Sequence, residues 1–132
     1  MNRIFADSFY WIALLNIEED AHAQARGLAG RFRGRIVTSQ AVLIEVMDAL
    51  CSPPYRAVAH RFWRTVREDP GVVVVRFDDA MLDRAAAMFQ TRSDKRWSLT
   101  DCLSFAIMAD RGIEEALTMD HHFRQAGFRT SF

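Results

Sequence analysis

Short apolar runs alternate along the chain with longer segments in which apolar residues recur at helical spacing. The short runs, rich in β-branched and aromatic residues, predict strands at residues 3–6, 35–38, 72–75, 116–119 and 128–130. The periodic segments between them predict helices at residues 9–15, 18–33, 40–50, 55–68, 78–89, 99–109 and 121–126. This alternation favours an α/β fold, a three-layer α/β/α sandwich around a central parallel sheet of four to five strands. At 132 residues, the chain is expected to form a single domain over 1–132.

Two segments stand out as deeply buried. Val72–Val75 is β-branched throughout, which predicts a strand covered on both faces. Residues 99–109 are almost all apolar or small, so their helix is expected to be buried all round. Ser98 and Asp101 have the spacing of a capping box at its start, and Gly112 is suited to end it.

Acidic residues occur where predicted strands end. Asp7 follows the first strand, and Asp120 follows the strand at residues 116–119. Asp101 lies at the start of the helix that precedes this strand. The helix runs roughly 16 Å away from Asp101, and the strand returns over about the same distance. Asp101 and Asp120 are therefore expected at the same edge of the sheet, where open α/β sheets hold ligands.

A further acid lies within an apolar helix. Glu45 shares a helical face with Val42, Val46 and Ala49, so it is expected to be at least partly buried. Because an unpaired buried carboxylate is costly, Glu45 needs a cation nearby, either a metal ion or an arginine. Simpler interpretations exist for the other acids, since Asp7 and Asp101 also suit helix caps and Asp120 suits a turn.

Composition leaves the partners of the chain open. Acidic and basic residues number 17 each, so the formal net charge is zero, and sixteen of the basic residues are arginines. The basic loop at residues 92–96 precedes Ser98 and is a candidate phosphate contact through Arg92, Lys95 and Arg96, while Trp97 is expected in the core. Cys51 and Cys102 match no metal-ligand spacing and are interpreted as buried thiols of a cytoplasmic protein. No apolar run approaches the length of a membrane span.

If the four acids Asp7, Glu45, Asp101 and Asp120 converge, like charges crowd one site and a cation must offset them. Oxygen ligands without a Cys or His set favour Mg²⁺ or Mn²⁺, ions suited to phosphodiester hydrolysis. Thr118 and Ser8 are candidates to hydrogen-bond the carboxylates or an attacking water. Consecutive His121 and His122 are expected to point in different directions and to make a poor shared metal site.

The segments FADSFYWIALLN, VLIEVMDAL, SLTDCLSFAIM and ALTMDHHF together resemble a PIN-domain ribonuclease, particularly the VapC-type toxins of toxin–antitoxin pairs. The resemblance covers nearly the whole chain. It implies a PIN-like fold and Mg²⁺- or Mn²⁺-dependent endoribonuclease activity. It implies a metal site on Asp7, Glu45, Asp101 and Asp120 with Thr118 as a supporting hydroxyl, and it implies a homodimer and a VapB-type antitoxin as partner.

The chain departs from this pattern at His122, where many relatives have a further Asp. A catalytically inactive protein- or RNA-binding module on the same fold is the alternative. Two other Asp-centred phosphoryl-transfer folds fit poorly. A haloacid-dehalogenase-like phosphatase requires an Asp where Phe9 stands, and a receiver domain requires an acidic pair and a late lysine that the sequence lacks.

Overall fold

The computed structural model describes residues 2–132. Five parallel strands lie within this range: β1 (Arg3–Ala6), β2 (Arg35–Ser39), β3 (Val72–Val75), β4 (Glu115–Leu117) and β5 (Arg129–Thr130). The helices are α1 (Ser8–Leu15), α2 (His22–Arg31), α3 (Gln40–Ala49), α4 (Pro53–Glu68), α5 (Asp79–Thr91), α6 (Leu99–Arg111) and α7 (His121–Gln125). The predicted order of elements is confirmed.

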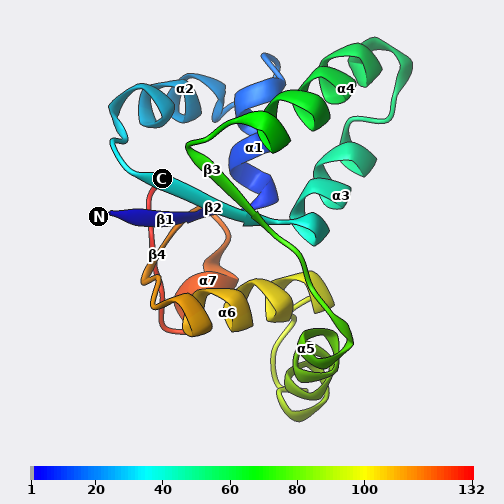
Figure 1. Ribbon diagram of the computed structural model, residues 1–132, viewed down its shortest axis with the longest axis vertical. Helices are drawn as coiled ribbons and strands as arrows, with labels where there is room; N and C mark the ends of the chain where they lie inside the picture. Colours follow the sequence, from blue (N-terminus) through cyan, green and yellow to red (C-terminus); the bar gives the residue numbers. More distant parts are fainter. Residues whose placement is uncertain (1) are drawn as a thin grey trace.

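The helices cover the two faces of the sheet (Figure 1). Helices α1 to α4 lie on one side, and α6 and α7 lie on the other, with α5 packed against α6 at the end of the molecule. The core between the layers is built from apolar side chains of both sets of helices and of the strands, including Phe5, Val37, Leu43 and Ile107. The α/β/α sandwich with a parallel sheet is therefore confirmed.

The strand order is β3-β2-β1-β4-β5. The chain builds outward from β1 to β3 on one side and then returns to add β4 on the other side of β1. The order thus reverses between β1 and β4, and the crevice beyond the carboxyl ends of these two strands is the switch point at which open α/β sheets bind ligands.

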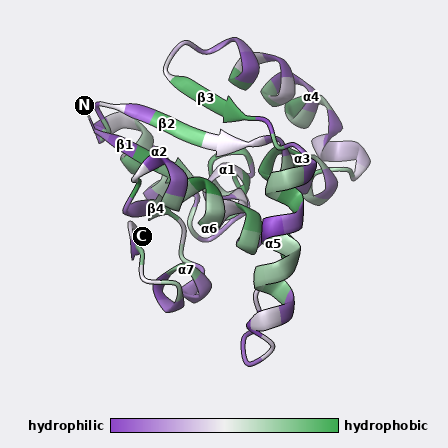
Figure 2. Cartoon of the chain, turned by 60° about the horizontal axis from the view of Figure 1, so that its bottom comes forward, coloured by the Kyte–Doolittle hydropathy of each residue, from purple (hydrophilic) through white to green (hydrophobic). Residues whose placement is uncertain are grey.

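The all-valine strand is less buried than its composition predicts. β3 is the apolar edge strand in Figure 2, and Val72, Val73 and Val74 are only half-buried while Val75 is buried. An edge strand has a neighbour on one side alone, so the prediction of burial on both faces was wrong. Strand β4 is also one residue shorter than predicted and ends at Leu117.

Two further predictions of burial need correction. Helix α6 is buried through its middle, from Cys102 to Met108, but Leu99 is 41% exposed and Ala109 is exposed. Cys51 follows the end of α3 and is exposed, so only Cys102 is the buried thiol that was predicted. Among the helices of residues 2–132, none has both the length and the apolar character needed to cross a membrane.

Candidate active site

Asp7 lies at the carboxyl end of β1, inside the crevice between β1 and β4. It occupies the N-cap position of α1, yet its side chain makes no capping hydrogen bond, so capping does not explain its presence. It is 5% exposed. Burial raises the pKa of Asp7 to about 7, against hydrogen bonds from the Ser8 backbone and Thr118, while the charges of Asp101 and Glu45 add to the rise.

Thr118 joins the ends of β1 and β4. Its buried hydroxyl donates to Asp7 Oδ2 at 3.0 Å and accepts from the Asp120 backbone N–H at 3.0 Å. The first bond fixes the Asp7 carboxylate, and the second fixes the turn that carries Asp120. One side chain therefore sets the relative position of two acids that are 113 residues apart in sequence.

Asp101 is both a helix cap and a member of the acidic group. Its carboxylate accepts from the Ser98 backbone N–H, and Ser98 Oγ accepts from the Asp101 backbone N–H, each at 3.0 Å. The predicted capping box is thus confirmed. Desolvation raises the pKa of Asp101, and the charge of Asp120 adds to the rise, whereas the Ser98 N–H and His122 act against it.

Glu45 projects from the middle of α3 and is half-buried, as predicted. Burial raises its pKa, with the nearby charges of Asp101 and Asp120 adding to the rise and a hydrogen bond with Ser8 opposing it. Within residues 2–132, no arginine or lysine forms an ion pair with any of the four acids. The arginine partner that would have made Glu45 a structural residue is therefore absent from this part of the chain.

Asp120 begins α7, and its Oδ1 accepts from the His122 backbone N–H at 2.9 Å. This turn brings the His122 ring into the acidic group, with Nδ1 3.0 Å from Asp101 Oδ2 and 3.2 Å from Asp120 Oδ1. The rings of His121 and His122 lie 4.5 Å apart, and ligand atoms of Asp120, His121 and His122 all lie within 4.8 Å of one another. The prediction that the two histidines point apart was wrong.

The pKa values of Asp7, Glu45 and Asp101 are all raised, in part by the charges of other acids in the group. The pKa of Glu45 responds to Asp101 and Asp120, and the pKa of Asp7 responds to Asp101 and Glu45. Such mutual repulsion in a partly buried crevice is relieved by a cation. Carboxylate oxygens with one nearby imidazole are a donor set that fits a divalent metal ion of the Mg²⁺ or Mn²⁺ class.

The basic loop before α6 is partly neutralised by its own acid. Asp94 pairs with Arg92 at 3.2 Å and with Lys95 at 3.5 Å, and the Arg92 guanidinium lies 4.9 Å from the centre of the Trp97 ring. Trp97 is buried and donates to Gln125, which confirms its place in the core. Phosphate contacts from Arg92, Lys95 and Arg96 stay a prediction.

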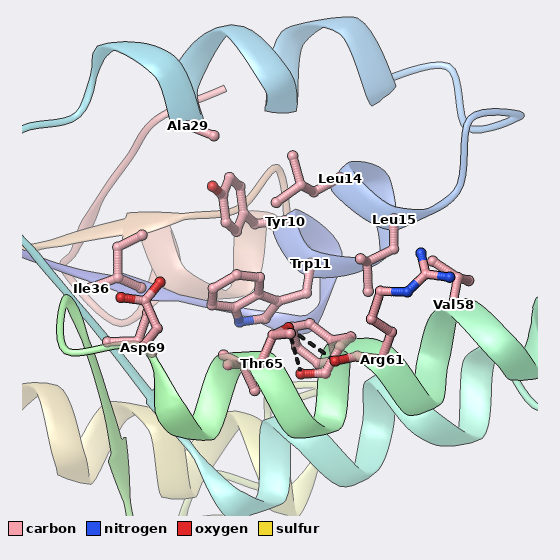
Figure 3. A pocket seen from close by; sticks show the side chains of 13 residues that line it. Tyr10, Trp11, Leu14, Leu15, Ala29, Ile36, Val58, Arg61, Thr65 and Asp69 are labelled. Atoms are coloured by element: carbon pink, nitrogen blue, oxygen red, sulfur yellow. Dashed lines mark hydrogen bonds between the residues drawn. The ribbon is translucent and has the colours of Figure 1, made fainter.

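A groove of about 420 Å³ lies between α1, α2 and α4 (Figure 3). It is lined mainly by apolar side chains, among them Trp11, Leu15 and Val58, with Arg61 and Asp69 also in its wall. Ile36 and Val72, near the amino-terminal ends of β2 and β3, form part of its floor. The groove is therefore separate from the acids, which lie beyond carboxyl-terminal strand ends.

Comparison with known proteins agrees with this fold. The family model for the PIN domain matches residues 4–129. The chain is 33% identical over 128 residues to the 23S rRNA-specific endonuclease VapC20 of Mycobacterium tuberculosis, covering 95% of both chains. The crystal structure of that protein, described as a sarcin–ricin-loop-cleaving toxin, superposes with a TM-score of 0.88 at 28% identity over 95% of each chain.

More distant structures share the fold alone. FitAcB from Neisseria gonorrhoeae has a TM-score of 0.71 at 14% identity, covering 98% of this chain and 96% of that one. VapBC2 from Rickettsia felis, bound to a DNA fragment from its promoter, has a TM-score of 0.67 at 10% identity and covers 98% of both chains. The family model and the identity to VapC20 extend over nearly the whole sequence, and the chain belongs to the PIN-domain family.

Proposed function

We propose that this protein is a metal-dependent endoribonuclease and the toxin of a VapBC-type toxin–antitoxin pair. The observation that carries the proposal is the group of four acids at the β1/β4 switch point, with Asp7 buried and no arginine or lysine paired to any of them within residues 2–132. A binding module has no need to bear the cost of partly buried carboxylates that lack an arginine or lysine partner. The relatedness to a 23S rRNA endonuclease over 95% of the chain supports RNA as the substrate.

Asp7, Glu45, Asp101 and Asp120 would hold the metal, Mg²⁺ or Mn²⁺. A divalent ion in such a site lowers the pKa of a bound water and stabilises charge on the phosphate during phosphodiester hydrolysis. Thr118 would keep Asp7 oriented through its hydroxyl, and the Ser98 N–H would keep Asp101 oriented through the capping box. In hydrolysis, the water oxygen forms a bond to phosphorus as the bond from phosphorus to the leaving oxygen breaks.

RNA loops are the proposed substrate class, because sequence-specific proteins read unstacked bases most readily there. A VapB-type antitoxin is the proposed partner, and a homodimer is the proposed assembly. The apolar residues Phe62, Trp63, Met88 and Phe89 differ in how far they are available for an interaction surface. Phe62 is buried in the core, Trp63 and Met88 are half-buried, and Phe89 is 52% exposed, so Phe89 is the candidate that best suits a surface role.

The proposal is tested by incubating the purified protein with total RNA and with a synthetic sarcin–ricin-loop RNA, with and without Mg²⁺ or Mn²⁺. We expect defined fragments that require metal. The variants Asp7→Asn and Asp101→Asn should lower the cleavage rate at least about 100-fold, since each replaces a charged metal ligand by a neutral amide.

Asp110→Asn is the matched control. Asp110 lies on the same helix as Asp101, but it is at the surface, where it pairs with Arg84 at 2.8 Å. This variant should cleave as the unchanged protein does. Folded protein without metal-dependent cleavage would favour the inactive binding module, and cleavage that persists in both site variants would show that the acids are not the active site.

A further inference from the structure

The geometry points to His122 as a nitrogen ligand of the metal ion, which gives this site a preference for Mn²⁺ over Mg²⁺. The inference rests on the proposed metal site and assigns one more residue to it.

The position of the imidazole nitrogen supports this role. His122 Nδ1 lies 3.0 Å from Asp101 Oδ2 and 3.2 Å from Asp120 Oδ1. Two adjacent ligands of an octahedral ion, each about 2.1–2.2 Å from the metal, are separated by about 3.0–3.1 Å. Each of the two distances therefore suits a pair of neighbouring ligands on one ion.

The ring is held in place by local structure. The Asp120 carboxylate accepts from the His122 backbone N–H, which fixes the second residue of α7 relative to the acid. Side chains on a helix point back toward its amino terminus, so a residue at this position directs its ring to the start of α7, where Asp120 lies. The His122 side chain is only 18% exposed.

His121 is less suited to the same role. Its side chain is 64% exposed, and its Nδ1 is 3.8 Å from Asp120 Oδ1, the one acid with which it pairs in residues 2–132. Asp101 contacts only the second of the two histidines. The adjacent pair therefore supplies a matched internal control for the experiment.

Imidazole changes which ions the site prefers. Mg²⁺ favours oxygen ligands and retains its waters, whereas affinity for nitrogen-containing sites rises from Mn²⁺ along the later divalent metals. A site of carboxylates and one imidazole should thus select Mn²⁺ over Mg²⁺ more strongly than a site of carboxylates alone.

The direct test is pulsed electron paramagnetic resonance of Mn²⁺ bound to the purified protein, because electron spin echo envelope modulation detects a coordinated nitrogen. We expect nitrogen modulation in the unchanged protein and in His121→Ala, and its loss in His122→Ala and His122→Asp. Mn²⁺ that binds without nitrogen modulation, or modulation that survives both His122 substitutions, would overturn the inference, as would failure to bind Mn²⁺.

Calorimetric titration gives a second readout. His122→Ala should weaken Mn²⁺ binding about 10- to 100-fold and Mg²⁺ binding much less. His122→Asp should bind Mg²⁺ more tightly than His122→Ala does, because it adds an oxygen donor. If His122 instead acts as a cation that neutralises Asp101 and Asp120 in the metal-free protein, removing it will strengthen the binding of both ions and contradict the inference. RNA cleavage in Mg²⁺ is measured separately, so a protein that cleaves RNA without nitrogen ligation refutes this inference alone.

Discussion

Asp7 makes the stability of the metal-free protein depend on pH. Burial raises its pKa from 3.8 to about 7, so the folded state binds more protons than the unfolded state between these values. The free energy of unfolding should therefore fall as pH rises from about 4 to 7, by up to roughly 4 kcal/mol from this group. The raised pKa values of Glu45 and Asp101 act in the same direction.

The measurement is urea unfolding between pH 4 and pH 8 in the presence of a chelator. Asp7→Asn should flatten the profile and be the more stable protein at pH 8, because the amide carries no charge to desolvate. Adding Mn²⁺ at pH 8 should restore stability to the unchanged protein by binding its folded state. A profile that rises with pH over this range would contradict the assignment of Asp7 as a buried, unpaired acid.

Thr118 is expected to matter through its hydroxyl rather than its size. Thr118→Val keeps the shape but leaves Asp7 Oδ2 and the Asp120 N–H without this partner, which should cost about 1–3 kcal/mol and lower the cleavage rate at least about tenfold. Thr118→Ser retains the hydroxyl and should retain most of the activity. Equal rates for the two variants would show that the hydroxyl has no positioning role.

At the level of single residues, the sequence predicted the acids better than the histidine. Asp7 and Asp120 follow strands, and the capping pattern of Ser98 identified the place of Asp101. The position of the His122 ring beside Asp101 and Asp120 was not predicted, because the two adjacent histidines were expected to point in different directions. The indication available in the sequence was the acid two residues earlier, since an N-cap Asp that accepts the His122 backbone N–H holds that ring beside its own carboxylate.

The capping box of α6 couples helix stability to the site, and a second cap in the molecule allows that coupling to be measured. Ser98 caps α6 beside the acids, while the Asp78 side chain caps α5 by accepting from the Met81 backbone N–H at 2.9 Å. Ser98→Ala and Asp78→Ala should each cost about 1 kcal/mol of unfolding free energy. Only Ser98→Ala should also lower RNA cleavage, severalfold, because it loosens the turn that orients Asp101. Equal RNA cleavage by the two variants would show that the Ser98 cap stabilises α6 without affecting the role of Asp101 in cleavage.

Helix starts were predicted well because local capping residues determine them. The burial and order of the strands were predicted less well because packing between distant segments determines them. The starts of α3 and α6 follow from Ser39 and Ser98, whose hydroxyls accept from backbone N–H groups inside each helix. The burial of β3 was overestimated because valine content does not distinguish a central strand from an edge strand. Strand order is set by packing between distant segments, so the placement of β4 beside β1 required the structure.

At the scale of the whole molecule, the acids and the apolar groove occupy different ends of the sheet. The acids lie beyond the carboxyl ends of β1 and β4, and the groove includes Ile36 and Val72 near the amino ends of β2 and β3. A partner that binds in the groove would leave the acids in place and would need a second segment to reach them. This arrangement suits an antitoxin with an amphipathic or aromatic tail.

The prediction at this scale concerns inhibition by such a partner. A cognate VapB-type antitoxin, co-expressed with this chain, should form a complex that no longer cleaves RNA. Val58→Glu and Arg61→Glu alter the groove between α1 and α4 and should weaken that complex at least about tenfold, since burying a new unpaired carboxylate is costly. Both variants should retain RNA cleavage in the absence of the antitoxin, which would show that they fold.

Ile17→Glu is the control, because Ile17 is 78% exposed just beyond α1 and does not line the groove. A complex that tolerates both groove substitutions, or that Ile17→Glu disrupts instead, would place the antitoxin elsewhere on the surface.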